Sequence, residues 1–232
     1  MMEHRLALIV GANRGIGLAV TRELLARGWD VIATARQPET ATALRALAAA
    51  HPGRVSIPLL DMNDPAAVDG FADSLGGKML DTVLINAGVS GPEHRNANRV
   101  TAAEIGALMF TNAIAPIRLA RVIAAQIRPD SGVLAFTSSV MGSVSLNSGG
   151  HELYRASKAA LNSLTRGLWG ELRGRRLTMV SLHPGWVQTD MGGKTAPVSV
   201  PDSATGIVTV LEQQSGAHRH RFLDYTGAEL AW

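Results

Sequence analysis

The sequence predicts a single-domain α/β protein with a doubly wound parallel sheet of six to seven strands and helices on both faces. Three observations support this fold class. Short apolar runs recur along the chain, as expected of strands that are covered on both faces. Segments with helical spacing separate these runs, and the first run leads directly into a glycine-rich loop. Such regular alternation of strand and helix is typical of parallel sheets.

The expected strands are apolar runs that contain β-branched residues. They are apolar almost throughout rather than alternating, which favours burial of both faces. They are RLALIV (5–10), DVIATA (30–35), VSIPLL (55–60), DTVLIN (81–86), GVLAFTS (132–138) and LTMVSLH (177–183), with RFLDY (221–225) as the candidate for a seventh strand at the sheet edge.

The expected helices lie between these runs. Asp64 followed by Pro65 marks a helix start, because aspartate caps an amino end and proline suits the first turn. The helices are a stripe at Ile16, Val20, Leu24 and Leu25 that ends at Gly28, a stripe at Leu44, Leu47 and Ala48 that stops before Pro52, and the ranges 64–75, 101–128, 152–173 and 201–214.

The composition is that of a globular protein, with 232 residues, 46% hydrophobic and 18% charged. A net charge of +3 is too small to indicate binding to nucleic acid or to a membrane. There is no cysteine, and the seven histidines lack a ligand spacing, so we assign no disulfide and no metal. No apolar run reaches the roughly 18 residues of a membrane span, and no linker or leader is evident, so we expect one cytoplasmic domain over residues 1–232.

The loop GANRGIG (11–17) follows the first strand and precedes the first helix. Gly11 allows a tight turn, Gly15 lets backbone amides approach a pyrophosphate, and Gly17 permits close packing of helix on strand. A purely structural turn is the alternative interpretation. The position between strand and helix favours a dinucleotide site, which makes the expected domain a Rossmann fold.

The second strand ends in ATARQPE, where an NAD site usually offers an acidic residue to the ribose. Ala35 and Arg36 occupy that place, and Arg14 lies inside the glycine loop. Arginine beside the adenosine ribose suits the additional phosphate of NADP, so we expect NADP(H) rather than NAD(H). Two ordinary surface arginines are the alternative.

Tyr154 and Lys158 lie in the helical stretch LYRASKAALN (153–162). A helix advances about 100° per residue, so the two side chains are about 40° apart on one face. An ammonium group near a phenol lowers the pKa of the phenol and makes it usable in proton transfer. By itself this spacing also fits ordinary helix sequence with a lone aromatic anchor.

Six motifs occur in the order found in one family. They are GANRGIG (11–17), INAG (85–88), TNAIAP (111–116), TSSVMGS (137–143), YRASK (154–158) and HPGWVQTDMGG (183–193). With them the chain resembles the short-chain dehydrogenase/reductases over nearly its whole length. GGHELYRASKAALN and PGWVQTDMGG are most similar to the branch that contains the Sniffer-type carbonyl reductases and the C-factor signalling protein.

The resemblance implies four catalytic residues. Tyr154 would donate a proton to a carbonyl oxygen, and Lys158 would lower the pKa of Tyr154 and hold the nicotinamide ribose. Ser139 would bind the substrate oxygen. Ser138 is the alternative, but the catalytic serine of the family stands three residues before a glycine, and Ser139 precedes Gly142 in this way. Asn112 would hold the water that links Lys158 to solvent. The interval from Ser139 to Tyr154 is longer than is usual in the family, so we expect this loop to influence specificity.

The resemblance also implies the cofactor contacts. Asp61 would meet the adenine amino group, although it could equally start a turn, and Thr189 would offer its hydroxyl to the nicotinamide end. The full set is Gly11, Asn13, Arg14, Gly15, Ile16, Gly17, Arg36, Asp61, Met62, Asn86, Ala87, Gly88, Tyr154, Lys158, Pro184, Gly185, Val187 and Thr189.

The expected function is reduction of a small ketone or aldehyde to an alcohol with NADPH, or the reverse oxidation. The alternative is an NADP-binding regulatory or signalling protein with little or no turnover. An epimerase or a dehydratase is a third reading, because the fold alone does not fix chemistry. We expect a small-molecule carbonyl or alcohol as partner, no nucleic acid or membrane, and a homodimer or homotetramer. The short segment from Met191 to Asp202 predicts a pocket with limited closure.

Overall fold

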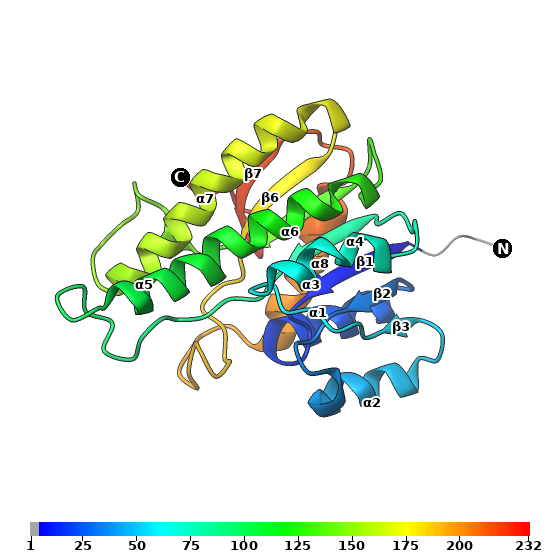
Figure 1. The fold of residues 1–232 in the computed structure, drawn as a ribbon, viewed down its shortest axis with the longest axis horizontal. Coiled ribbons are helices and arrows are strands. Elements are labelled where there is room, and N and C mark those ends of the chain that lie inside the picture. Colours follow the sequence, from blue (N-terminus) through cyan, green and yellow to red (C-terminus); the bar gives the residue numbers. More distant parts are fainter. Residues whose placement is uncertain (1–4) are drawn as a thin grey trace.

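One seven-stranded sheet runs through the computed structural model, which describes residues 5–232 (Figure 1). All its strands are parallel, in the order β3-β2-β1-β4-β5-β6-β7. The strands are β1 (Leu6–Val10), β2 (Asp30–Ala33), β3 (Val55–Ser56), β4 (Thr82–Ile85), β5 (Val133–Thr137), β6 (Thr178–His183) and β7 (His220–Asp224). The predicted fold class is therefore confirmed, including the seventh strand at the edge.

Helices cover both faces of the sheet. The first face carries α1 (Gly15–Ala26), α2 (Thr42–Ala50) and α8 (Val200–Gln213). The second carries α3 (Pro65–Asp69), α4 (Phe71–Ser74), α5 (Ala102–Met109), α6 (Ala115–Ile123) and α7 (Glu152–Leu172). Short single turns are η1 (Pro38–Thr40), η2 (Phe110–Ile114), η3 (Ala124–Gln126), η4 (Val140–Gly142) and η5 (Arg173–Arg175).

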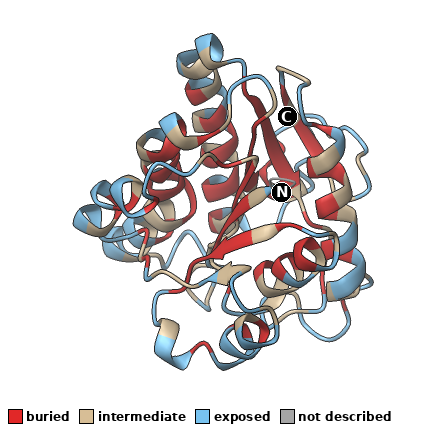
Figure 2. Cartoon of the chain, turned by 90° about the vertical axis from the view of Figure 1, so that its right-hand side faces the viewer, coloured by how far each residue is buried: buried red, intermediate tan, exposed pale blue. Residues whose placement is uncertain are grey.

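The core consists of two layers, one on each face of the sheet. Along β1, Ala7 and Ile9 belong to the layer under α1 and α8, whereas Leu8 and Val10 belong to the layer under α6 and α7. Figure 2 shows the strands buried and the helices exposed on their outer sides only. This pattern explains why the strand sequences are apolar throughout instead of alternating.

Several element ends differ from the sequence prediction for visible reasons. The third strand stops at Ser56, because Pro58 has no N–H to donate, and the pairing resumes only as a bridge between Ala35 and Leu59. The helix expected over 64–75 is broken at Gly70 into α3 and α4. The helix starts follow the expected capping: the Asp64 carboxylate accepts a hydrogen bond from the backbone N–H of Ala66.

The stretch expected as one long helix over 101–128 contains a π-helical turn, η2, between α5 and α6. A capping box between Thr101 and Glu104 starts α5. Within the described residues, Ala102–Gln126 is long and apolar enough to cross a membrane, with a hydropathy of 1.3, although it holds no continuous apolar run of that length. Since 56% of its apolar window is buried in the protein, it has the character of a core helix.

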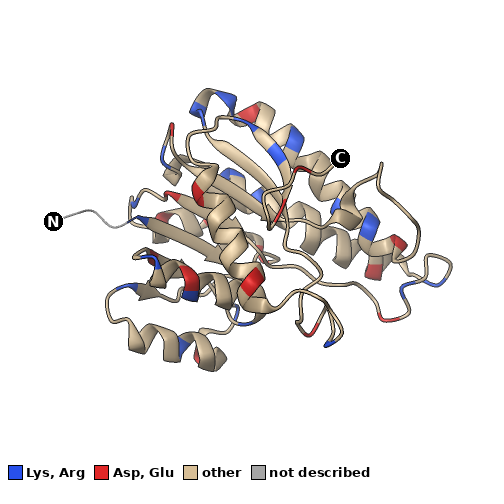
Figure 3. Ribbon diagram, turned by 180° about the vertical axis from the view of Figure 1, so that it is seen from behind, with Lys and Arg blue, Asp and Glu red and all other residues tan. Residues whose placement is uncertain are grey.

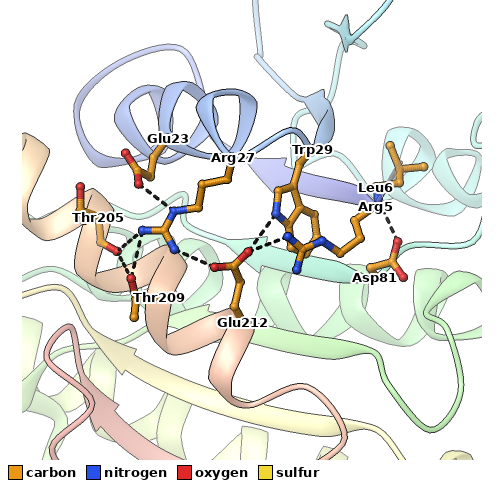
Figure 4. Close-up of polar contacts among 9 residues, drawn as sticks. All are labelled: Arg5, Leu6, Glu23, Arg27, Trp29, Asp81, Thr205, Thr209 and Glu212. Carbon is orange, nitrogen blue, oxygen red and sulfur yellow. Dashed lines mark hydrogen bonds and ion pairs between the residues drawn. The ribbon is translucent and has the colours of Figure 1, made fainter. Parts of the chain in front are cut away.

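A polar cluster joins α1 to α8 at the amino edge of the sheet (Figure 4). The Glu212 carboxylate binds Arg5 at 2.9 Å and Arg27 at 2.7 Å, and it accepts a hydrogen bond from Nε1 of Trp29 at 3.1 Å. Burial alone would raise the pKa of Glu212, but the hydrogen bonds from Arg27 and Trp29 and the two positive charges lower it. This cluster lies at the opposite edge from the loops that carry the predicted site residues.

Charged side chains are dispersed over the helices and loops in Figure 3, and both signs are mixed. Some of them form isolated surface pairs, such as Arg121 with Glu171 at 2.8 Å. The interior strands carry almost none.

Candidate active site

The predicted site residues gather along the carboxyl edge of the sheet. From β1 the chain passes outward through β2 and β3 and then crosses back to β4, which pairs with the other side of β1. In open parallel sheets, ligands bind outside the strand ends at such a change of direction. The loops after β1, β4, β5 and β6 are neighbours here.

The glycine loop between β1 and α1 has the shape of an anion site. Gly11 and Gly15 have positive φ angles of 81° and 55°. A β-carbon at Gly11 would lie 2.9 Å from Cβ of Ala87, and one at Gly17 only 2.2 Å from the carbonyl oxygen of Gly11. No side chain caps α1, and its first turn has no acidic residue. Its first N–H groups are thus left for a negatively charged ligand, which fits the pyrophosphate of a dinucleotide.

Arg14 forms an ion pair that the sequence did not suggest. Its Nη1 lies 2.5 Å from Oδ2 of Asp190, on the loop after β6, and both side chains are largely exposed. A β-carbon at Gly15 would lie 3.6 Å from Cγ2 of Thr189, so the glycine loop and the loop after β6 face each other directly. Of the other two predicted residues in this loop, Asn13 is exposed and Ile16 packs partly against the core.

On the adenosine side of the predicted site, fewer side chains are available to contact a ligand. Arg36 is exposed after β2, as a phosphate contact would require. Asp61 accepts a hydrogen bond from the backbone N–H of Asn63 at 2.9 Å and so starts a turn, while its expected contact with the adenine stays a prediction. The side chain of Met62 packs in the core, which leaves only its backbone for a ligand.

Asn86, Ala87 and Gly88 follow β4 and lie against the glycine loop. The Asn86 amide donates to the carbonyl oxygen of Gly11 at 3.3 Å and accepts from the Thr137 hydroxyl at 3.0 Å, which ties β1, β4 and β5 together. A β-carbon at Gly88 would lie 3.2 Å from Oδ1 of Asn112 and 3.5 Å from Nζ of Lys158. Gly88 therefore keeps the space beside two predicted catalytic residues open.

Asn112 lies in the π-helical turn and is fully buried. Its Oδ1 accepts from the backbone N–H of Val89 at 2.8 Å, and its Nδ2 donates to the Val89 carbonyl at 2.8 Å and to the Ser157 hydroxyl at 3.0 Å. The side chain thus links the loop after β4 to α7. A π-helical turn inside a longer helix is frequently found at functional sites.

The two adjacent serines after β5 have different partners. Ser138 is buried and donates its hydroxyl to Oδ1 of Asn162 on α7 at 2.6 Å. The hydroxyl oxygen of Ser139 accepts from the backbone N–H of Met141 at 3.1 Å and is hydrogen bonded to the Tyr154 phenol. This arrangement favours Ser139 over Ser138 as the substrate-binding serine.

Tyr154 and Lys158 lie one turn apart near the start of α7, and Nζ of Lys158 is 5.8 Å from the centroid of the tyrosine ring. The ammonium donates to the Thr137 carbonyl at 2.8 Å instead of to the phenol. Burial raises the pKa of Tyr154 to about 12, although the hydrogen bond with Ser139 acts in the other direction. Burial lowers the pKa of Lys158 to about 8. The pKa of Tyr154 therefore lies above its ordinary value, because burial outweighs the interactions that lower it, and the contribution expected from Lys158 stays a prediction.

The loop after β6 carries the remaining predicted contacts. Gly185 has a φ of 88°, and a β-carbon there would lie 3.1 Å from the Tyr225 ring. Val187 is buried and pairs with Val198, which closes the loop on itself. The Thr189 hydroxyl accepts from the backbone N–H of Gly192 at 3.1 Å. Pro184 is buried, and its carbonyl accepts from Ser203 on α8 at 2.7 Å.

Sequence reasoning missed three groups that shape the site. The Thr137 carbonyl and Asp190 gave no signal, since backbone acceptors and exposed ion pairs over long sequence separations leave no local pattern. Asn162 did have one. It lies one helical turn after Lys158, so the spacing that linked Tyr154 to Lys158 also places Asn162 on that side of α7.

Comparisons with known proteins agree with this geometry. Residues 5–198 match the short chain dehydrogenase family. C-signal from Myxococcus xanthus is 39% identical over 166 residues, which cover 70% of this chain and 98% of that protein. A carbonyl reductase from Pseudomonas aeruginosa PAO1 in complex with NADP superposes with a TM-score of 0.93 at 41% identity, over 99% of this chain and 100% of that one. Carbonyl reductase Sniffer of D. melanogaster does so with a TM-score of 0.89 at 34% identity, over 99% and 100%.

Proposed function

Because the chain belongs to the short-chain dehydrogenase family, we propose that it is an NADPH-dependent oxidoreductase that reduces a ketone or an aldehyde to an alcohol. The observation that carries this proposal is the arrangement around Tyr154. Its phenol is hydrogen bonded to Ser139, and the Lys158 ammonium is buried one turn below. The carbonyl reductases among the similar structures support the same class of substrate.

The cofactor would lie across the switch between β1 and β4. The glycine loop would bind the pyrophosphate, Arg36 and Arg14 the additional phosphate of the adenosine ribose, and Lys158 the nicotinamide ribose. When bound, the nicotinamide supplies the hydride. The remaining proposed contacts are Asn13, Ile16, Asp61, Met62 through its backbone, Asn86, Ala87, Gly88, Pro184, Gly185, Val187 and Thr189.

Tyr154 would act as the acid in the reduction. A phenol with a pKa of about 12 keeps its proton at neutral pH and can donate it to the substrate oxygen as that oxygen gains negative charge. The Ser139 hydroxyl would donate a hydrogen bond to the same oxygen and hold it in place. The Lys158 ammonium would stabilise the phenolate that remains, and Asn112 would hold the water through which the proton is restored.

A signalling role with little or no turnover is the second candidate. The 39% identity with C-signal over nearly all of that protein supports it. A protein that only binds the cofactor has no need of Tyr154, Ser139, Lys158 and Asn112 together, which is why we favour the enzyme. An epimerase or a dehydratase ranks third, since nothing in the site favours either reaction over reduction.

We propose that residues 1–232 form one domain, since the seven strands belong to one sheet. We also propose that the protein works in the cytoplasm. We further propose assembly into a homodimer or homotetramer, which sedimentation of the purified protein would test.

The deciding experiment is a panel of ketones and aldehydes incubated with NADPH and, separately, NADH, with Tyr154→Phe as the test variant. We expect turnover with NADPH, and its loss in Tyr154→Phe while the Kd of NADPH stays within about twofold, since the substitution removes only the phenolic hydroxyl. A variant that keeps its rate would contradict the mechanism. Tight NADPH binding without turnover across the whole panel would favour the signalling role.

A further inference from the structure

Residues 226–232, which we call the return segment, turn back after β7 and run along its outer edge. Leu223 and Glu229 form an antiparallel bridge. The backbone N–H of Leu230 donates to the Phe222 carbonyl at 2.8 Å, and that of Asp224 donates to the Ala228 carbonyl at 2.9 Å. The segment therefore pairs with the edge strand of the sheet and delivers Trp232 to the start of β7.

The indole ring of Trp232 contacts both the sheet and α7. Its centroid lies 4.8 Å from that of the His220 ring and 5.3 Å from that of the Phe222 ring. The guanidinium carbon of Arg166, on α7, lies 5.2 Å from the indole ring. These contacts hold the backbone of Trp232 in a defined place.

The backbone of Trp232 in turn holds the loop that follows Ser139. Its main-chain oxygen accepts from the backbone N–H of Ser145 at 3.2 Å and from the Ser145 hydroxyl at 2.8 Å. Next to this contact, the hydroxyl oxygens of Ser143 and Ser145 are 3.2 Å apart, and the backbone N–H of Leu146 donates to the Ser143 hydroxyl at 3.1 Å.

Residues 143–151, which we call the serine–tyrosine loop, join Ser139 and η4 to the helix that carries Tyr154. Every residue from Val144 to Glu152 is exposed, so burial does little to fix the position of this loop. A hollow of about 240 Å³ lies between the loop and α7, lined by Met141, Val144, Arg155 and Ala159 among others. The loop is supported by hydrogen bonds at its ends rather than by a packed core.

Contacts near both of its ends anchor the serine–tyrosine loop to the rest of the protein. Near α7, Arg155 donates to the Gly150 carbonyl at 2.8 Å and to the Ser148 hydroxyl at 3.4 Å, and Glu152, the first residue of α7, accepts from the backbone N–H of Ala97 at 2.6 Å. The contact of Ser145 with Trp232 holds the end that leads on from Ser139.

We propose that Trp232 is a positioning residue that fixes the serine–tyrosine loop and thereby selects which carbonyl compounds reach Tyr154. The effect on selection rests on the proposed function, whereas the anchoring of the loop does not. Trp232 acts through Ser145, which donates to its main-chain oxygen, whereas its ring lies against His220, Phe222 and Arg166. The loop that it holds connects the segment that carries Ser139 to the helix that carries Tyr154.

The anchoring is tested by amide hydrogen exchange in Trp232→Ala. We expect exchange of the Ser145 amide, which donates to Trp232, to become about tenfold faster, and exchange of the neighbouring Leu146 amide, which donates to Ser143, to rise with it, because loss of the ring frees the main chain of Trp232. Exchange in β1 and the Kd of NADPH should stay unchanged, and Trp232→Phe should restore protection. Trp169→Ala is the matched control, because it removes an indole that stacks on Arg173 farther along α7. Unchanged exchange at Ser145 overturns the proposal, and so does a loss of protection that extends equally to β1.

The proposed effect of Trp232 on substrate preference is tested with the compounds that the wild-type protein reduces in the carbonyl panel. We expect Trp232→Ala to raise KM by about threefold to tenfold, most for the bulkier compounds, with kcat within about twofold, as for an altered binding position. Ser145→Ala should give part of this effect and should not add to it in the double variant. An unchanged order of preference overturns the selection. A wild-type protein that reduces nothing refutes the proposed function, while the exchange experiment still decides whether Trp232 anchors the loop.

Discussion

At the scale of single residues, burial sets the chemistry of the site more than neighbouring charge does. Burial raises the pKa of Tyr154 and lowers the pKa of Lys158, because the surroundings of both side chains disfavour the charged form. The spacing of the two residues could be read from the sequence. The direction of the lysine could not, because its partner is the backbone carbonyl of Thr137, which any residue would supply.

The lowered pKa of Lys158 predicts a pH dependence of carbonyl reduction. Below about pH 8 the amine is charged and can stabilise the phenolate of Tyr154, and above that pH it becomes neutral. We expect kcat/KM at saturating NADPH to be level from pH 6 to 7.5 and to fall as the pH rises through about 8. Lys158→Arg, which stays charged, should lose this inflection in whatever rate remains. The same inflection in the arginine variant would assign it to another group.

Arg36 predicts the choice between the two cofactors. Reversing its charge in Arg36→Asp removes a charge-assisted hydrogen bond to the additional phosphate, so the Kd of NADPH should rise by about tenfold to hundredfold while that of NADH changes little. Fluorescence titration of both cofactors measures this ratio. Arg219→Asp, an equal charge change at the exposed amino end of β7, is the control. An unchanged ratio of the two Kd values would indicate that Arg14 binds the additional phosphate, which would require its ion pair with Asp190 to break.

At the scale of elements, the sequence predicted where strands and helices occur better than how they are interrupted. Apolar runs and caps are local signals, so the seven strands and the start of α3 could be found. The π-helical turn that directs Asn112 toward α7 has no such signal, because it depends on packing between helices that are distant in sequence. The early end of β3 does have a signal in the sequence, since Pro58 lies inside the apolar run 55–60.

The junction between β1 and α1 predicts an effect of adding a single methyl group. In Gly17→Ala the new carbon would lie 2.2 Å from a backbone oxygen of Gly11, so α1 must shift away from the glycine loop. We expect a loss of about 1–3 kcal/mol in the free energy of unfolding and weaker NADPH binding. Gly106→Ala on α5, where nothing lies within 4 Å, should be neutral or stabilising by up to about 1 kcal/mol. Equal behaviour of the two variants in urea denaturation would refute the packing argument.

At the scale of the whole molecule, two histidines connect stability to pH. Burial lowers the pKa of His183 to about 4 and that of His220 to about 3 from an ordinary value near 6.5, with Arg166 adding to the effect at His220 and Asp224 opposing it at His183. Both are neutral in the folded protein at pH 5, whereas the unfolded chain takes up protons below about pH 6.5. The stability that they contribute is present above that pH and is lost as the pH falls toward 4.

We therefore expect the free energy of unfolding, measured in urea, to drop between pH 7 and pH 5. Each pKa unit of such a shift corresponds to about 1.4 kcal/mol. The double variant His183→Gln/His220→Gln should show a much flatter profile over the same range. A profile as steep as that of the wild type would mean that other groups carry the dependence.

The order of strands has a consequence for synthesis on the ribosome. The first strand made, β1, lies inside the sheet, and every later strand pairs with one that has already left the exit tunnel: β2 with β1, β3 with β2, β4 with β1, and so on to β7. The sheet can thus grow outward from its oldest strand without waiting for a distant partner. The glycine loop is complete before the tyrosine helix is translated, and the residues beyond Asp224, which cover the outer edge of β7, are made after all seven strands.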